Sequence, residues 1–272
     1  MNYKVKTPAG DFEVDLTNDY YGEGFWSNLE RGLWEPDTIS FLSQRVDNEV
    51  DFIDIGAANG SISLVAASHG ARVLAFEVEE LIFNVARRNF ELNRHLNGEI
   101  EIKNIAISKK NEVMSYSKNS DPKIVSSIMF GSGSGSGSQL EVQSLLDVVN
   151  NFHKSARSLI VKIDVEGAEW NILNDLETLK VLKNHKATVL LAIHPGFHRP
   201  YKKLFLGMTV LSKTFWQIRN VLEAYKFFKS IMAYANIYRT NLDPIKHPKK
   251  CVLLMLGGYF EFILEFGNHE RL

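Results

Sequence analysis

Carboxylate and imidazole groups follow strand-like apolar runs at three places in this 272-residue chain. Asp54 lies within the first run, residues 50–55. Asp164 directly follows the second run, residues 159–163, and His194 directly follows the third, residues 188–193. Carboxylates bind cations and accept hydrogen bonds, and imidazole, with an unperturbed pKa of ~6.5, is the usual general base near neutral pH. Ligands of open α/β sheets lie beyond the carboxyl ends of the strands, so these side chains are expected to face one crevice.

The run that contains Asp54 continues into a turn of small residues and then into the helical spacing of residues 61–67. A buried strand, such a turn and a helix make the first half of a nucleotide-binding βαβ unit. Small residues let the backbone approach a ligand closely, and the helix N-terminus offers unpaired N–H groups to it. We therefore predict a cofactor site made of Asp54, Gly56, Ala58, Asn59 and Gly60.

The residues around this turn indicate the kind of cofactor. Glu77 ends the next apolar run, where an acidic side chain can accept hydrogen bonds from both hydroxyls of a ribose. The nicotinamide fingerprint is Gly-x-Gly-x-x-Gly, whereas this turn reads Gly-x-Ala-x-Gly after a carboxylate that suits a cationic ligand. S-adenosylmethionine carries a ribose, a positive sulfonium and no phosphate, so we predict it as the cofactor. Three further residues are assigned to the rim of the site: Glu35, Asn104 and Ala106.

The second apolar run, 159–163, ends in an acidic stretch that holds Asp164, Glu166 and Glu169. We expect Asp164 and His194 to flank an acceptor hydroxyl, with His194 as the base and Asp164 orienting it or the substrate. The alternative is a divalent cation, magnesium or manganese, held by Asp164, Glu166 and His194. Glu169 is interpreted as a favourable charge at a helix N-terminus.

Four residues are candidates for substrate contacts. The aromatic, glycine-rich stretch 18–26 contains Tyr21 and either closes over a ligand or covers one edge of the core. His198 and Arg199 follow His194 closely, and Arg199 suits an anionic substrate group. Glu166 is the fourth candidate, from the acidic stretch.

The remaining segments predict the elements that position these side chains. Residues 3–15 predict a hairpin, 213–238 a long amphipathic helix, and 251–256 with 259–266 a closing pair of antiparallel strands. We divide the chain into an N-terminal part, 1–48, and a cofactor-binding domain, 49–272. Residues 131–138 are four Gly-Ser pairs, which we interpret as an engineered linker that replaces a loop, flanked by the two arms of a hairpin.

Composition narrows the class of protein. Hydrophobic residues make up 45% of the chain and charged residues 23%, which is the balance of a globular domain. A net charge of −1 gives no general reason to bind nucleic acid, and a single cysteine, Cys251, excludes an internal disulfide. No apolar run approaches the ~18 residues of a membrane span. We expect a cytoplasmic protein without a membrane span; its oligomeric state is left open.

Several of these motifs together resemble the FkbM-type methyltransferases. The resemblance rests on Asp54–Gly60, Phe76-Glu77, Leu146-Asp147 and, above all, the stretch Lys162-Ile163-Asp164-Val165-Glu166-Gly167-Ala168-Glu169. It implies a class I methyltransferase fold, with a mostly parallel seven-stranded sheet, helices on both faces and a C-terminal antiparallel hairpin. It also implies O-methylation of a hydroxyl of a sugar or glycan. Many members have Asn where this chain has Ala58, and Glu where it has His194.

Two functions of other classes stay open at this point. One is an NAD-dependent dehydrogenase, which a different reading of the turn would favour. The other is a non-catalytic module that binds a glycan or a partner with the same fold, because fold alone does not decide function.

Overall fold

The structure is a computed structural model that describes residues 1–8, 10–17, 19, 21–96, 98–116, 138–154, 156–165, 167–194 and 210–267. Four predicted features therefore lie outside the described residues: Glu166, His198, Arg199 and the Gly-Ser segment up to residue 137.

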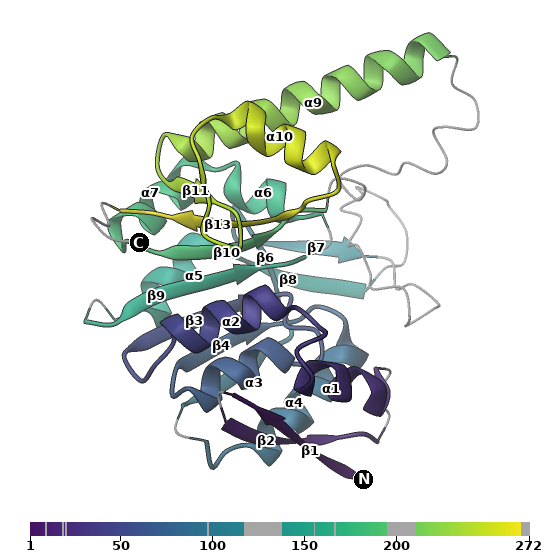
Figure 1. The fold of residues 1–272 in the computed structure, drawn as a ribbon, viewed down its shortest axis with the longest axis vertical. Helices are drawn as coiled ribbons and strands as arrows, with labels where there is room; N and C mark the ends of the chain where they lie inside the picture. Colours follow the sequence, from purple (N-terminus) through teal and green to yellow (C-terminus); the bar gives the residue numbers. More distant parts are fainter. Residues whose placement is uncertain are drawn as a thin grey trace.

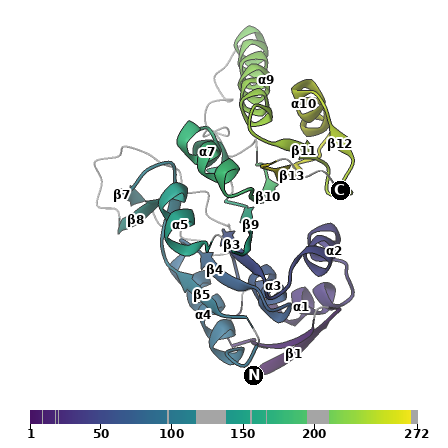
Figure 2. The same ribbon diagram turned by 90° about the vertical axis from the view of Figure 1, so that its left-hand side faces the viewer.

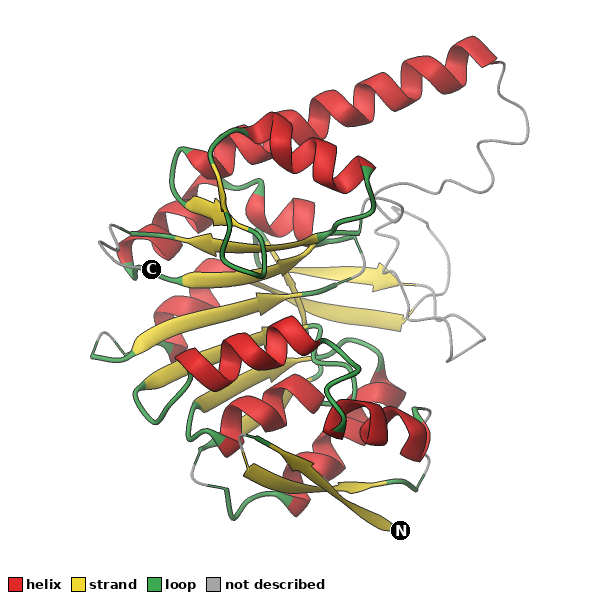
Figure 3. Ribbon diagram, in the orientation of Figure 1, coloured by secondary structure: helices red, strands yellow, loops and turns green. Residues whose placement is uncertain are grey.

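An eight-stranded sheet forms the centre of the molecule, in the order β12-β11-β13-β10-β9-β3-β4-β5 (Figures 1 and 3). Five neighbouring strands are parallel: β3 (Val50–Ile55), β4 (Arg72–Phe76), β5 (Ile100–Lys103), β9 (Ser158–Ile163) and β10 (Thr188–Ala192). The remaining three add antiparallel pairs at one edge: β11 (Asn236–Tyr238), β12 (Pro244–Ile245) and β13 (Glu261–Glu265). This is the class I methyltransferase architecture, with the two-residue β12 as an added edge strand.

The central strands are apolar on both faces, which explains why they are continuous apolar runs in the sequence. In β3, Phe52 belongs to the core on one face of the sheet, while Ile53 and Ile55 belong to the core on the other. Every residue of β3 is buried, including Asp51 and Asp54. A buried carboxylate in such a strand needs partners, so the groups around Asp51 and Asp54 indicate what each side chain does.

Helices cover both faces of the sheet (Figure 2). One face carries α2 (Pro36–Arg45), α3 (Ser61–Ser68) and α4 (Glu80–Leu92), with α1 (Gly22–Glu30) and the hairpin β1 (Asn2–Thr7) and β2 (Gly10–Asp15) packed outside them. The other face carries α5 (Leu145–Phe152), α6 (Glu169–Leu173), α7 (Leu176–Asn184), α9 (Val210–Met232) and α10 (Pro248–Leu256). Asn89 of α4 and Asn93, which directly follows α4, accept hydrogen bonds from backbone N–H groups of β2, and these bonds attach the predicted N-terminal hairpin to the body.

A small second sheet lies beside the carboxyl ends of the central strands. It contains β6 (Ala106–Ser108), β7 (Glu112–Tyr116) and β8 (Ser138–Ser144), in the order β6-β8-β7. The pairing of β7 with β8 is antiparallel, which confirms the hairpin predicted on either side of the linker.

Two predicted elements near the C-terminus were wrong in detail. Residues 251–256 form part of α10 rather than a strand, and β13 pairs instead with β10 and β11. Pro248 in the first turn and the His247 side chain, which accepts a hydrogen bond from Lys249 N–H, start the helix that a short apolar run alone did not reveal. The helix predicted over 213–238 ends at Met232, because residues 236–238 join the sheet as β11.

Within the described residues, none of the helices combines the length and the apolar character needed to cross a membrane.

Candidate functional site

The turn after β3 is held tightly against the neighbouring strands. The N–H groups of Gly56 and Ala57 both donate to the carbonyl oxygen of Phe76, at 3.0 Å each. Gly56 has φ +85°, and a Cβ at this position would lie 1.8 Å from the carbonyl oxygen of Asp164. Glycine is therefore required here by both backbone conformation and space.

Asp54 and Lys162 lie side by side on adjacent strands, in direct register between β3 and β9. The Oδ2 atom of Asp54 accepts a 2.7 Å hydrogen bond from the Ser63 hydroxyl, but Oδ1 is buried without a hydrogen-bond partner among the described residues. Burial raises the pKa of Asp54, and the charge of Lys162 opposes this shift. An unpaired buried carboxylate oxygen is costly and suggests a ligand group that completes it.

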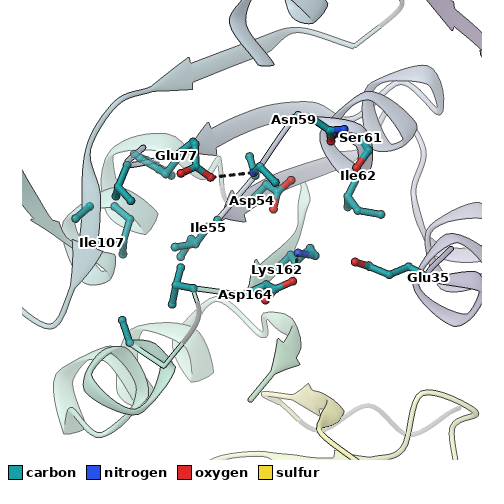
Figure 4. Close-up of a pocket in the computed structure, with 18 of the residues that line it drawn as sticks. Glu35, Asp54, Ile55, Asn59, Ser61, Ile62, Glu77, Ile107, Lys162 and Asp164 are labelled. Carbon is teal, nitrogen blue, oxygen red and sulfur yellow. Dashed lines mark hydrogen bonds and ion pairs between the residues drawn. The ribbon is translucent and has the colours of Figure 1, made fainter. Parts of the chain in front are cut away.

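Lys162 is the cation at the centre of the site (Figure 4). Its Nζ lies 3.0 Å from Oδ2 of Asp164, and Glu35 points toward it from the far side. Burial alone would lower the pKa of Lys162, but the carboxylates of Asp164, Glu35 and Asp54 outweigh it and raise the pKa. Lys162 therefore stays protonated throughout the physiological pH range.

Glu35 is presented by an unusual backbone conformation. It precedes α2 with φ +41°, in the left-handed region that non-glycine residues rarely adopt. Burial raises the pKa of its carboxyl group, while Lys162 acts in the opposite direction. Such strain is found at functional sites, where surrounding contacts maintain it.

Glu77 follows β4 and closes the turn from the other side. Its Oε2 accepts a 3.0 Å hydrogen bond from Ala58 N–H, and its Oε1 accepts a 2.9 Å hydrogen bond from Glu79 N–H. Burial raises the pKa of Glu77 to about 7, against the lowering effect of these backbone bonds. Each carboxylate oxygen has more than one lone pair, so Glu77 can also accept hydrogen bonds from the two hydroxyls of a ribose.

These groups line one cavity at the carboxyl ends of the strands. Its walls include the turn 56–59 and Ile105–Ile107, and its rim carries Tyr21, Phe25 and Trp34. The Phe25 ring lies 5.2 Å from Tyr21 and 4.8 Å from Trp34, so the three form a continuous aromatic edge. The cavity combines this edge with a surplus of carboxylates over the one cation Lys162 among the lining residues that the structure describes.

A second, smaller cavity adjoins the first. Glu35, Lys162 and Asp164 line both. Its outer wall includes Thr240, whose hydroxyl donates to Oδ2 of Asp37 at 2.6 Å and so links the segment after β11 to α2. The two cavities together reach from the turn after β3 to the first residue of β13, Glu261.

His194, at the end of β10, contacts a carboxylate other than the one predicted. Its Nδ1 lies 2.9 Å from Oε1 of Glu169 and 3.7 Å from Oδ1 of Asp164. Glu169 is fully buried, and the same Oε1 accepts hydrogen bonds from the N–H groups of Val165 and Gly167. Glu169 thus does more than favour the dipole of α6, because it connects the loop after β9 to the imidazole.

The structure brings most of the predicted cofactor residues together. Asp54, Gly56, Ala58, Asn59, Glu77, Ala106 and Glu35 line the first cavity, as do the predicted Tyr21 and Asp164. The Nδ2 atom of Asn59 is buried there without a hydrogen-bond partner among the described residues.

Two of the predicted cofactor residues have other surroundings, and the predicted base His194 lines neither of the two cavities. The amide of Asn104 donates to the carbonyl oxygens of Glu77 and Val78, at 2.9 and 3.0 Å, so it supports the wall from behind. Gly60 leaves room for the ring of Phe90, which a Cβ would approach to 2.4 Å. Both residues shape the cavity through their neighbours, and neither is among those that line it.

Sequence analysis did not assign Lys162, Ser63, Glu169, Phe25 or Trp34 to the site. A signal existed for Lys162, because a lysine inside an otherwise apolar buried strand needs a carboxylate partner. The other four depend on which faces of separate elements meet, and spacing along the chain does not reveal this.

Comparisons with known proteins find similarity to methyltransferases. The profile of the methyltransferase FkbM domain matches residues 54–229, which is more than half of the chain. The ribosomal protein L11 methyltransferase of Syntrophomonas wolfei is 45% identical over 56 residues, which is 20% of this chain and 18% of that protein.

Two solved structures give weaker similarities. Methyltransferase FkbM from Methylobacillus flagellatus KT has a TM-score of 0.36 and 13% identity, covering 71% of this chain and 54% of that chain. The structure of WbdD has a TM-score of 0.42 and 13% identity, covering 88% of this chain and 40% of that chain. The chain therefore spans about half of these two structures or less.

Proposed function

The chain belongs to the FkbM methyltransferase family, and from this premise we propose that it transfers a methyl group from S-adenosylmethionine to a hydroxyl group of a sugar or glycan. When bound, S-adenosylmethionine supplies an electrophilic methyl group on a sulfonium. The proposal rests above all on one observation: Oδ1 of Asp54, in the wall of the first cavity, is buried and has no hydrogen-bond partner among the residues that the structure describes.

Asp54 fits a positively charged ligand. An ionised carboxylate that is fully buried and lacks one partner is best completed by a cation or a donor group of the ligand. The cavity also holds Glu35, Asp164 and Glu77 against the single ammonium of Lys162. This surplus suits the sulfonium and ammonium groups of S-adenosylmethionine and disfavours the pyrophosphate of NAD.

Glu77 and Asn59 suit the nucleoside part. The carboxylate of Glu77 would accept the two ribose hydroxyls, and the amide of Asn59 would donate to an acceptor atom of the ligand. The small residues at 56–58 leave the backbone open to the ligand.

Two features favour a sugar acceptor. The aromatic edge of Tyr21, Phe25 and Trp34 offers an apolar surface for the C–H face of a sugar ring. The second cavity, with Asp37, Thr240 and Glu261, offers acceptors for its hydroxyls. Asp164 lies at the junction of the two cavities, where an acceptor hydroxyl would meet the methyl group.

We propose that His194 is the general base that accepts the proton of that hydroxyl. An ionised carboxylate only accepts hydrogen bonds, so Glu169 fixes the proton of His194 on Nδ1 and makes Nε2 the basic nitrogen. Nε2 would accept the proton that the hydroxyl loses when it is methylated, while the sulfonium–methyl bond of the cofactor breaks and neutral S-adenosylhomocysteine leaves. A positioned base contributes about 10²–10⁴-fold to such a rate. Alignment of the two reactants between the cavities supplies a further share of the rate.

The alternative scheme is a divalent cation, magnesium or manganese. Asp164, Glu169 and His194 offer ligand atoms that all lie within 4.8 Å of one another, so Glu169 takes the place that the sequence suggested for Glu166. We favour the base scheme because Oε1 of Glu169, the oxygen that contacts His194, already accepts hydrogen bonds from two backbone N–H groups. Full activity after dialysis against a chelator supports the base, and activity that returns only with added metal supports the cation.

The test of the proposed function combines binding and turnover. Calorimetric titration with S-adenosylmethionine and with NAD identifies the cofactor, and mass spectrometry of candidate glycans incubated with methyl-labelled cofactor detects the product. Tight binding of NAD alone would replace the proposal with a dehydrogenase. Glycan binding without methyl transfer to any acceptor, unchanged in Asp54→Ala, would replace it with a binding module.

A further inference from the structure

The outer faces of α9 and α10 form one surface that combines exposed leucines with lysines. The two helices pack against each other and lie in the same layer over the sheet, so their outer faces point away from the body (Figures 1 and 2). The leucine–lysine surface consists of Leu222, Lys226 and Lys229 on α9 and Lys249, Lys250, Leu253 and Leu256 on α10.

Helical periodicity explains how these residues come to share one face. On α9, Ala224, Phe227, Phe228 and Ile231 are buried in the core, and the exposed residues recur at positions 222, 226 and 229 on the opposite side. On α10, Cys251, Val252 and Met255 are buried, and positions 249, 253 and 256 face outward. Leu222 is 53% exposed, and Leu253 and Leu256 are 67% exposed each.

The charge of this surface differs from that of the chain. It carries four lysines, while the whole protein has a net charge of −1. The sequence of α10 contains no acidic residue, and that of α9 contains Glu223 alone, which is half-buried. The outer faces of α9 and α10 therefore combine basic and apolar groups.

We propose that the leucine–lysine surface binds an anionic lipid bilayer. Leucines that enter the boundary between headgroups and acyl chains lose their contact with water, and lysines beside them attract anionic headgroups while their stems stay apolar. A second copy of the chain is a poorer occupant, because a symmetric dimer would bring the lysines of both copies together without acidic partners from the surface. Nucleic acid would pair with the lysines but leave the leucines exposed.

The surface lies apart from the proposed catalytic groups, so the inference is independent of the proposed function. None of its residues lines either cavity of the candidate site. A membrane-bound protein would hold that site near lipid-attached acceptors, but binding itself is expected with or without an acceptor.

Co-sedimentation with vesicles tests the proposal on the full chain. We expect binding to vesicles of phosphatidylglycerol and phosphatidylcholine, none to pure phosphatidylcholine, and loss of binding at ~1 M salt, where the Debye length falls to ~3 Å. Leu253→Ser with Leu256→Ser, and separately Lys249→Glu with Lys250→Glu, should each weaken binding by about tenfold or more.

Helix α4 provides a matched control, because Leu81 is 48% exposed there and Arg87 is also exposed. Leu81→Ser with Arg87→Glu should leave vesicle binding unchanged, and thermal melting checks that all variants fold. Absence of wild-type binding, or equal loss in the α4 control, overturns the proposal. A dimer seen by light scattering that the leucine substitutions dissociate, without vesicle binding, also overturns it in favour of a second copy.

Discussion

Asp54 and Lys162 face each other across the parallel strands β3 and β9, and both are buried. Neither group would be tolerated alone at this depth, because an unpaired buried charge is strongly destabilising. Lys162 also faces Asp164 and Glu35, so one ammonium compensates several carboxylates, and one oxygen of Asp54 has no hydrogen-bond partner in the part of the chain that the structure describes. In the proposed function, the cationic groups of S-adenosylmethionine would complete the charges of this site.

Asp54→Asn should change binding and stability in opposite directions. Loss of the carboxylate should weaken S-adenosylmethionine binding by roughly 10–150-fold, as for a lost hydrogen bond to a charged group of about 1.5–3 kcal/mol. The free protein should melt at a higher temperature near pH 8, because burial raises the pKa of Asp54 and disfavours its ionised form. Calorimetry and thermal melting measure the two effects. Asp11→Asn, in an exposed ion pair with Lys4, is the control and should alter neither.

Lys162→Met should destabilise the protein at neutral pH. The substitution leaves Asp54, Asp164 and Glu35 without their shared cation, and breaking a buried pair costs about 3–5 kcal/mol. Urea denaturation at pH 7 measures the loss. The same experiment at pH 5 should show a smaller loss, because protonation of the carboxyl groups with raised pKa removes the repulsion. An equal loss at both pH values contradicts this explanation.

Glu77 should make cofactor affinity and protein stability depend on pH in opposite senses. Its pKa is about 7 in the folded chain, above the ordinary 4.5, so its contribution to stability is complete below pH 4.5 and is lost as the pH rises through 7. Accepting both ribose hydroxyls needs the ionised form, so affinity for S-adenosylhomocysteine should rise through pH 7 and level off above it. Titrations between pH 5.5 and 8.5 measure this dependence.

Glu77→Gln provides the comparison. Its affinity for S-adenosylhomocysteine should be lower at pH 8 and nearly independent of pH, and its stability should fall less between pH 5 and 8 than that of the wild type. The remaining fall comes from other carboxyl groups whose pKa values burial raises, namely Asp54, Glu35 and Glu261. A pH dependence of affinity that persists unchanged in Glu77→Gln assigns it to another group.

Gly56→Ala should be far more damaging than Gly32→Ala. Both glycines have positive φ, +85° and +64°, so both substitutions carry the cost of a left-handed alanine, about 1–2 kcal/mol. Only at Gly56 would the new Cβ meet the backbone, 1.8 Å from the carbonyl oxygen of Asp164, whereas nothing lies within 4 Å at Gly32. Thermal melting and S-adenosylmethionine binding should separate them: Gly32→Ala keeps its affinity, and Gly56→Ala loses it.

The sequence predicted the parts of the site that lie within one stretch of chain. The turn 56–60, Glu77 and Asp164 stand at the ends of buried strands, and parallel strands place such ends together. Contacts between side chains of different elements were harder to predict from the sequence. The amide of Asn104 donates to the backbone after β4, and Glu169 of α6 contacts His194, which follows β10. The helix α10 was missed because a short apolar run fits a strand and a helix equally well.

Glu169→Gln tests whether Glu169 positions His194. If Glu169 fixes the tautomer, the substitution should lower kcat by about 10–100-fold and shift the pH profile, while the KM for S-adenosylmethionine stays within about twofold. His194→Gln should lose at least as much activity, and the double variant should lose no more than His194→Gln alone, because the two residues act as one unit. Glu169→Asp, which keeps the charge on a shorter side chain, should recover part of kcat. A purely structural role predicts instead a lower melting temperature with kcat and KM affected together, and losses in the double variant that add.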